Sequence, residues 1–402
     1  MTLALLACMT AGAQAEDFKM SASDGKSDSV NKNKPVFTVI KENPITSIKD
    51  QNRSGTCWDY STLSFFEAEI LKATGKTYDL DESFVANKTY MERAIQVVRY
   101  HGDCQFAQGG SAEDVLATMK THGIIPQGIM PFPGSLYGDS LNNFNEFFKL
   151  LEPYVAAIAK SDAKKISNQW KVGLQGILDA YLGKCPEEFT YEGKKYTPKS
   201  FVQTLGINLD DYVSITSYTH HPFYTTFAVE VQDNWRWGES LNLELDDFMK
   251  IIDDAIANGY TVLWGGDVSE EGFTRDGMAV YPDMQAPDAP GADQARWLKL
   301  DRKAKGEELT KKPLPQKVVT AEERQRGYDN FETGDDHGMH LFGTAKDQEG
   351  NKYYLIKNSW GKTGKYDGIW YMTPEFARAK TLNYVVNKAA ISKDLKKKYG
   401  IK

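Results

Sequence analysis

In the stretch Asp50-Gln51-Asn52-Arg53-Ser54-Gly55-Thr56-Cys57-Trp58-Asp59-Tyr60, a loop of turn-forming residues runs into a thiol and then directly into a helix pattern. Bulky residues follow Cys57 at helical spacing, and Gly75 stands where a C-terminal cap belongs. Cys57 is therefore predicted in the first helical turn, where free backbone N–H groups and the macrodipole favour thiolate over thiol. Gln51 offers an amide N–H₂ to a developing oxyanion, with the Cys57 N–H as second donor. The alternative is a buried structural cysteine beside an exposed glutamine.

A second stretch, nearly three hundred residues later, supplies a base. Residues 335–343 read Asp-Asp-His-Gly-Met-His-Leu-Phe-Gly, and residues 352–361 read Lys-Tyr-Tyr-Leu-Ile-Lys-Asn-Ser-Trp-Gly. Two β-rich runs joined by a short glycine-containing turn predict a hairpin, with His337 and Asn358 at neighbouring ends. A cysteine nucleophile needs a base and the base needs an orienting partner, which predicts Cys57, His337 and Asn358 as a catalytic set. Trp360 is predicted to shield the His337–Asn358 hydrogen bond from water.

These three motifs, in this order, resemble the papain-like cysteine peptidases. The resemblance implies an α+β fold of two lobes, a helical lobe with the nucleophile and an antiparallel β lobe with the histidine and asparagine. It favours His337 as the base, because Gly338 follows it and Gly343 lies six residues on, whereas His340 is expected to face the other side of its strand. It also implies that the pair Gly109-Gly110 lines the cleft and binds substrate backbone; the alternative is a plain loop before a helix.

Weaker matches spread over the chain resemble the bleomycin hydrolase and aminopeptidase C branch, among them residues 80–84, 196–201 and 264–268. The branch implies a cysteine aminopeptidase acting on peptides. Two features depart from it. Asp59 follows the Cys-Trp pair and is expected to oppose thiolate formation if it points inward. Forty-one residues follow Gly361, fewer than the long C-terminal arm of the branch. An endopeptidase with an open cleft and a catalytically silent peptide binder therefore stay as alternatives, whereas a transglutaminase-type acyltransferase normally has Asp in place of Asn358.

The expected boundaries follow the composition along the chain. Residues 1–15 resemble a signal peptide and residues 16–35 a tether, so we expect an exported protein, periplasmic or extracellular, with lipid attachment at Cys8 as the minor option. Residues 36–402 form the peptidase domain, with a helical lobe at about 45–210 and a β lobe at about 211–402. A helical insertion at about 141–184 resembles the one that builds oligomer contacts in the branch, and suggests a homo-oligomer. Residues 282–334 are expected to form a surface excursion, with a solvated loop preferred over a lid.

Composition argues for a globular enzyme that does not bind nucleic acid. The net charge of −7 speaks against nucleic acid, and no run is apolar enough to span a bilayer. The sequence indicates no cofactor and no metal: His220 and His221 are adjacent, and adjacent strand residues point to opposite faces. Cys104 and Cys185 either pair or stay free, since no spacing supports a disulfide.

Overall fold

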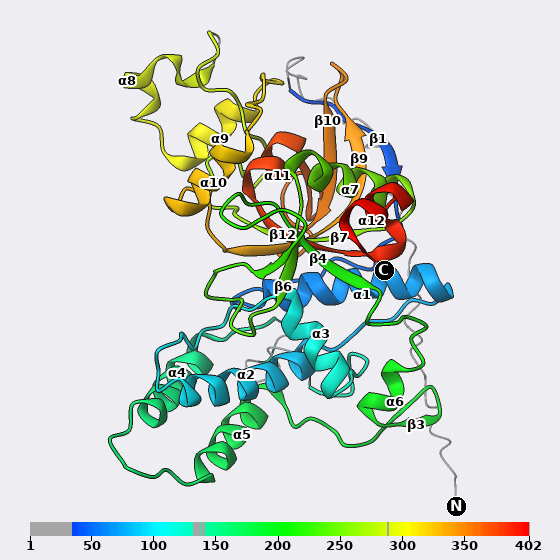
Figure 1. Ribbon diagram of the computed structural model, residues 1–402, viewed down its shortest axis with the longest axis vertical. Coiled ribbons are helices and arrows are strands. Elements are labelled where there is room, and N and C mark those ends of the chain that lie inside the picture. The colour runs from blue at the N-terminus through cyan, green and yellow to red at the C-terminus, as the bar shows by residue number, and fades with distance from the viewer. Residues whose placement is uncertain (1–33, 132–137, 139–140, 288, 402) are drawn as a thin grey trace, which may run out of the picture. The chain divides into compact units, whose positions relative to one another are not determined.

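The computed structural model describes residues 34–131, 138, 141–287 and 289–401. The expected signal peptide and nearly all of the expected tether lie outside the described residues. The described chain builds a layer of helices and a large sheet with further helices around it (Figure 1).

The helical layer comes from the first half of the chain, as the sequence predicts. Helix α1 spans Cys57–Thr74, and Gly75 ends it in the left-handed conformation with its N–H donating to Leu71 O. The layer continues with α2 (Glu82–Arg99), α3 (Ala112–Thr121), α4 (Asn145–Ala159), α5 (Gln169–Leu182), the hairpin of β2 (Phe189–Tyr191) and β3 (Lys194–Tyr196), and α6 (Pro198–Val202). Helices α4 and α5 lie within the predicted helical insertion and share one apolar core with α1 and α2.

The sheet has the order β5-β6-β4-β12-β7-β9-β10-β11-β8, with β1 paired to β9. Its strands are β1 (Thr38–Glu42), β4 (Tyr212–Thr216), β5 (Thr226–Ala228), β6 (Glu239–Asn242), β7 (Val262–Gly266), β8 (Met278–Ala279), β9 (His337–Lys346), β10 (Lys352–Lys357), β11 (Ile369–Met372) and β12 (Thr381–Asn387). Most pairs are antiparallel, as expected, but β4–β6 and β8–β11 are parallel. The sheet is therefore mixed near its two ends and antiparallel through its centre.

The predicted hairpin is β9 and β10, and it lies in the middle of this sheet. Lys357 pairs with His340, which brings the start of β9 beside the residue that follows β10. On its other side β9 pairs with β7, where His337 lies opposite Gly266. His337 and Asn358 are thus held at the same edge by central strands on both sides.

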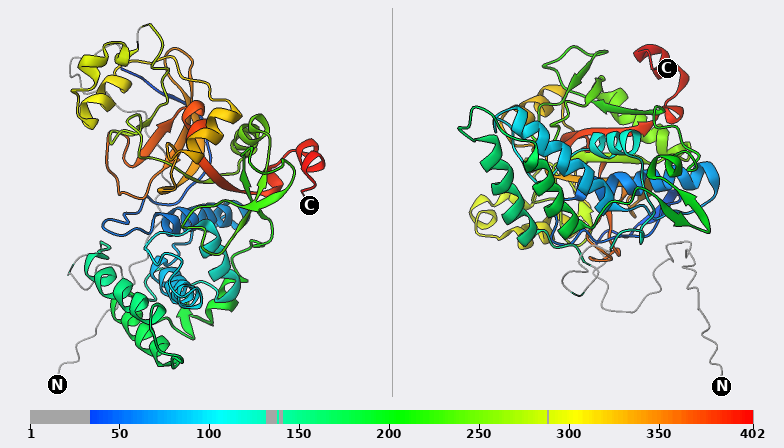
Figure 2. Two further views of the ribbon diagram at one scale, coloured as in Figure 1. Left: turned by 60° about the vertical axis from the view of Figure 1, so that its left-hand side comes forward. Right: turned by 90° about the horizontal axis from the view of Figure 1, so that it is seen from below.

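Helix α1 is enclosed on two sides. Every residue from Trp58 to Ile70 is buried, because α2 and α3 cover one side of the helix and β7 and β9 pack on the other (Figure 2). The enclosed residues include Glu67, which accepts hydrogen bonds from Thr46 Oγ1 at 2.6 Å and from the Leu80 N–H at 2.9 Å. Lys49 Nζ lies 3.2 Å from the same carboxylate and also contacts Glu82. A buried charge on α1 therefore holds the preceding loop and the start of α2.

The predicted excursion at 282–334 is more ordered than a solvated loop. It contains the 3-10 turn η2 (Pro290–Ala292) and helices α8 (Gln294–Trp297), α9 (Arg302–Thr310) and α10 (Ala321–Asp329). Arg324 on α10 is buried and donates to the carbonyl oxygens of Ser217 at 2.9 Å and Arg378 at 3.0 Å. The preference for a solvated loop was wrong for α10, because one buried guanidinium satisfies backbone acceptors that the strands leave free.

The C-terminal part adds a strand to the sheet and ends in a short helix. Helix α11 (Pro374–Lys380) leads into β12, which pairs with both β4 and β7. The turn η3 (Lys388–Ala390) and helix α12 (Lys393–Tyr399) follow, and α12 packs against α7 (Leu245–Ala257), where Lys398 Nζ lies 2.6 Å from Asp247 Oδ2.

Replacing Glu67 tests the buried network. Glu67→Gln removes the charge opposite Lys49 while keeping the side-chain shape, so we expect a loss of about 3 kcal/mol in the free energy of unfolding. Urea denaturation followed by circular dichroism measures it. Glu152→Gln, an exposed change on α4, is the control and should leave stability unchanged. Equal stability of the two variants would contradict a structural role for the Glu67 charge.

Candidate active site

A cleft of about 710 Å³ runs between the helical layer and the sheet. The sequence-predicted residues that line it are Gln51, Cys57, Gly109, Gly110, His337 and Trp360. Asn358 lies behind the cleft wall and is buried. Gly338, directly after His337, lies against the backbone of Cys57 and Trp58, so the start of β9 touches the start of α1. The structure thus brings the separate motifs to one groove.

The hydrogen bonds of Asn358 determine the tautomer of His337. Asn358 Oδ1 accepts from the Ser359 N–H at 2.7 Å, which fixes the oxygen end of the carboxamide. The same oxygen lies 2.8 Å from His337 Nε2. Because Oδ1 only accepts, Nε2 carries the hydrogen of the neutral ring, and Nδ1 keeps its lone pair. His337 is therefore held in the form that takes a proton at Nδ1.

Trp360 lies against the ring of His337. Its ring lies 4.8 Å from the His337 ring, centre to centre, and His337 is 6% exposed. His340 lies elsewhere: it is fully buried, and its Nδ1 is 2.9 Å from Ser64 Oγ on α1. His340 does not line the cleft, so the placement of the two rings agrees with His337 as the base.

The loop before α1 is fastened to the segment after β10. The Gln51 N–H donates to Ser359 O at 2.8 Å, and Ser359 Oγ donates to Gln51 Oε1 at 2.6 Å. Gln51 Nε2 donates one hydrogen to Ser54 O at 2.7 Å, which leaves the second for a ligand. The carboxamide of Gln51 is therefore oriented before any substrate binds.

Burial acts against charge on both Cys57 and His337, in the direction opposite to the expected thiolate. Enclosure by the cleft walls raises the pKa of Cys57 to about 12, and the carboxylates of Asp335 and Asp233 act in the same direction. Burial lowers the pKa of His337 to about 4, against the effect of Asn358. Desolvation and two nearby negative charges outweigh the helix N-terminus.

Asp59 has a different effect from the one expected. It is fully buried, and burial raises its pKa well above its usual range. Asp59 is not among the groups that act most strongly on the Cys57 thiol. The charges that raise the pKa of the thiol belong to Asp335 and Asp233, to which the sequence interpretation gave no role.

The glycine pair has a steric reason besides substrate approach. A Cβ on Gly109 would overlap the carboxylate of Asp233, and one on Gly110 would lie 2.9 Å from the Trp58 ring. Asp233 Oδ1 in turn contacts Arg93 Nη2 at 3.3 Å, and Arg93 also donates to Gly109 O. Only glycines let this part of the cleft wall fit between an indole and an ion pair.

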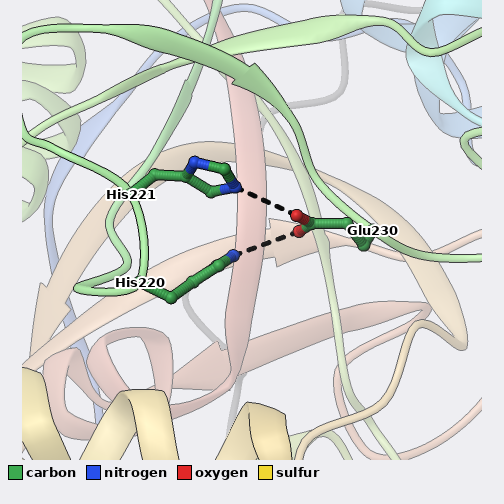
Figure 3. Close-up of side chains that lie close together, drawn as sticks. All are labelled: His220, His221 and Glu230. Carbon is green, nitrogen blue, oxygen red and sulfur yellow. Dashed lines mark hydrogen bonds and ion pairs between the residues drawn. The ribbon is translucent and has the colours of Figure 1, made fainter.

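The two adjacent histidines do not follow strand geometry. Strand β4 ends at Thr216 and β5 begins at Thr226, so His220 and His221 lie in a bend between them. Both rings point at Glu230, as Figure 3 shows, with Nε2 to carboxylate-oxygen distances of 3.1 and 3.0 Å. The reason given against a metal, that the two rings diverge, was therefore wrong.

Two further expectations concern a disulfide between Cys104 and Cys185 and a helix that could cross a membrane. Cys104 and Cys185 are free and partly buried. Among the described residues, no helix combines the length and apolar character needed to cross a bilayer. Within the described residues, three side chains lie close enough together to hold one metal ion: His220, His221 and Glu230.

A helix that begins with a cysteine, facing a sheet that presents a histidine–asparagine pair across one cleft, defines the papain-like cysteine peptidases. The sequence model of the Peptidase C1-like family matches residues 6–310 and 318–402. This chain therefore belongs to the Peptidase C1-like family.

Relatives agree with this assignment. The chain is 24% identical to aminopeptidase C of Lactococcus lactis subsp. cremoris, over 90% of this chain and 85% of that one. It is also 24% identical to aminopeptidase C of Lactobacillus delbrueckii subsp. lactis, over 91% and 84%. Among solved structures, PepW from Lactobacillus rhamnosis HN001 superimposes with a TM-score of 0.65 at 20% identity, covering 91% of this chain and 86% of that chain, and shares the fold.

Replacing Asp335 tests the charge on the thiol. Removing a negative charge makes the thiolate less costly, so Asp335→Asn should lower the pKa of Cys57 by up to about one unit. The pH profile of iodoacetamide alkylation at Cys57, followed by peptide mass spectrometry, measures the shift. Asp162→Asn, on an exposed loop, should leave the profile unchanged. An unshifted profile for Asp335→Asn would show that its carboxylate does not act on the thiol.

Proposed function

We propose that this protein is a cysteine aminopeptidase that hydrolyses peptides through Cys57, His337 and Asn358. The observation that carries the proposal is the His337–Asn358 hydrogen bond at 2.8 Å, which leaves Nδ1 as the proton acceptor in the cleft that also holds the thiol. The aminopeptidase names of the relatives supply the substrate class.

The reaction follows from this arrangement of the thiol and the imidazole in one cleft. His337 Nδ1 takes the thiol proton as Cys57 Sγ bonds to the substrate carbonyl carbon, and the carbonyl oxygen becomes an oxyanion. The free hydrogen on Gln51 Nε2 and the Cys57 N–H, which has no acceptor within its own helix, stabilise that oxyanion. The imidazolium then protonates the leaving amine as the C–N bond breaks. Water, deprotonated by His337, releases the acid and restores the thiol.

A free amino terminus would meet negative charge in this cleft. Asp233, Asp335 and Asp336 all line it, and enclosure together with the neighbouring carboxylates raises the pKa of Asp335 to about 7. Those charges also raise the pKa of Cys57, so a bound ammonium group would offset them. The described residues of the C-terminal helix pack on α7 and do not line the cleft. We therefore assign recognition of the substrate amine to side-chain carboxylates, Asp335 foremost.

Three variants test the catalytic set. Cys57→Ala should abolish hydrolysis of an alanyl or leucyl amide while the circular dichroism spectrum stays unchanged, because the nucleophile is lost and the fold is not. His337→Ala should be nearly as damaging. His340→Gln, the matched change at the buried histidine, should keep most of the kcat of the folded enzyme. Activity in Cys57→Ala, or greater loss at residue 340 than at residue 337, would refute the assignment.

A pair of substrates tests the amine requirement. Peptide amides with a free amino terminus should be cleaved and their N-acetylated forms should not, because acetylation removes the positive charge. Asp335→Asn should lower kcat/KM for the free-amine substrate by about tenfold or more, as expected for the loss of a charge-assisted contact. Equal cleavage of both forms would identify an endopeptidase. Absence of cleavage, together with an unreactive Cys57 towards a thiol probe, would identify a peptide binder.

A further inference from the structure

The cluster of His220, His221 and Glu230 has the donor set of a transition-metal site. Each residue offers one ligand atom, and these three atoms lie within 4.8 Å of one another. The Nε2 atoms of His220 and His221 approach different oxygens of Glu230, at 3.1 and 3.0 Å (Figure 3). Tetrahedral zinc with bonds of about 2.0–2.1 Å separates its ligand atoms by about 3.3 Å, so small movements would place a cation between these groups.

The hydrogen bonds of Gln325 bear on what lies between His220 Nε2 and the Glu230 carboxylate, a proton or a metal cation. Gln325 Oε1 accepts from the backbone N–H groups of Thr219 and His220 at 2.7 and 3.1 Å, and its Nε2 donates to Asp329. The orientation of this buried carboxamide is thereby fixed. His220 Nδ1 lies 3.1 Å from the same Oε1 and donates to it in the tautomer that carries the ring hydrogen on Nδ1. In the neutral ring, Nε2 then presents a lone pair to the Glu230 carboxylate.

Two lone pairs at 3.1 Å repel unless a proton or a metal cation lies between them. A metal-ligating histidine characteristically donates its other ring N–H to an oxygen acceptor, and Gln325 has that position here. An imidazolium ion would also satisfy the contact for His220. The presence of a second imidazole aimed at the other oxygen of the same carboxylate favours the cation.

The three side chains are held in place by their surroundings. The His221 ring stacks on Phe227 with 4.1 Å between centres, and the His220 ring stacks on Tyr328 at 5.8 Å. The Tyr328 hydroxyl donates to the Glu230 carbonyl oxygen at 2.9 Å. The side chains keep exposures of 29%, 37% and 50% in chain order, which leaves a solvent-facing position for a water ligand.

We propose that His220, His221 and Glu230 form a binding site for a divalent transition-metal ion, Zn²⁺ foremost, that fastens the bend after β4 to the cleft wall after β5. Val229 and Val231, on either side of Glu230, both line the catalytic cleft. Asp233 follows on the same segment and contacts Arg93 of the helical layer. A metal ion here stabilises this wall without touching the reacting atoms.

Metal titration of Cys57→Ala isolates the site, because this variant lacks the catalytic thiol that would itself bind zinc. The protein is freed of metal with a chelator and titrated with ZnCl₂ by calorimetry, and with Co²⁺ by visible absorption. We expect one equivalent to bind with a four-coordinate cobalt spectrum that lacks sulfur-to-metal charge transfer. Adding Glu230→Gln or His221→Ala to Cys57→Ala should weaken binding at least about tenfold.

His122→Ala in the same background is the matched control. His122 also contacts a glutamate, with Nε2 2.6 Å from Glu92 Oε1 and a similar exposure of 32%, so it shares the His–Glu pair but not the second imidazole. Its loss should leave zinc affinity unchanged.

A second experiment leaves the three proposed ligands unmutated. In Cys57→Ala, Zn²⁺ should protect His220 and His221 from modification by diethyl pyrocarbonate, which mass spectrometry detects. The proposal would be overturned if zinc did not bind, if it did not protect the two histidines, or if it still bound after Glu230→Gln. The three side chains would then form only an ion pair between the histidines and Glu230.

Discussion

The pairing of the loop before α1 with the segment after β10 is the constraint on which the catalytic arrangement depends. The Gly361 N–H donates to Lys49 O at 3.0 Å, and Gln51 and Ser359 exchange a backbone and a side-chain hydrogen bond. These contacts join residues that are about three hundred positions apart. One of the joined segments ends in Cys57 and the other begins with Asn358, so the same few bonds hold Cys57, Gln51 and Asn358 in place.

Buried charged side chains stabilise the loop that takes part in this pairing. Glu67 on α1 binds Thr46 and Lys49, and Lys357 Nζ donates to Thr46 O at 3.1 Å at the end of β10. Lys357 is buried, and this burial lowers its pKa to about 8. Buried ion pairs add little net stability but are costly to break, so the network favours one arrangement of loop, helix and strand over its alternatives.

The electrostatics of the cleft explain why the proposed function would favour substrates with a free amino terminus. Burial raises the pKa of the Cys57 thiol, with Asp335 and Asp233 acting in the same direction, and burial lowers the pKa of His337. An aminopeptidase substrate brings a positive charge to those carboxylates. On the proposed function, the correct substrate therefore removes part of the penalty on the nucleophile, and a substrate without a free amine does not.

The sequence by itself determined the local features: Cys57 at a helix start, Gly75 at its end and the β9–β10 hairpin, because spacing and turn residues act over short distances. It did not determine the burial that acts against charge on Cys57 and His337, the full burial of Asp59, the helix α10 within the excursion, or the convergence of His220 and His221 on Glu230. Each of these depends on burial and on neighbours that are remote in the chain. Only tertiary structure decides such features, because desolvation and charge act through space, and no local pattern of residues records which groups the fold will enclose together.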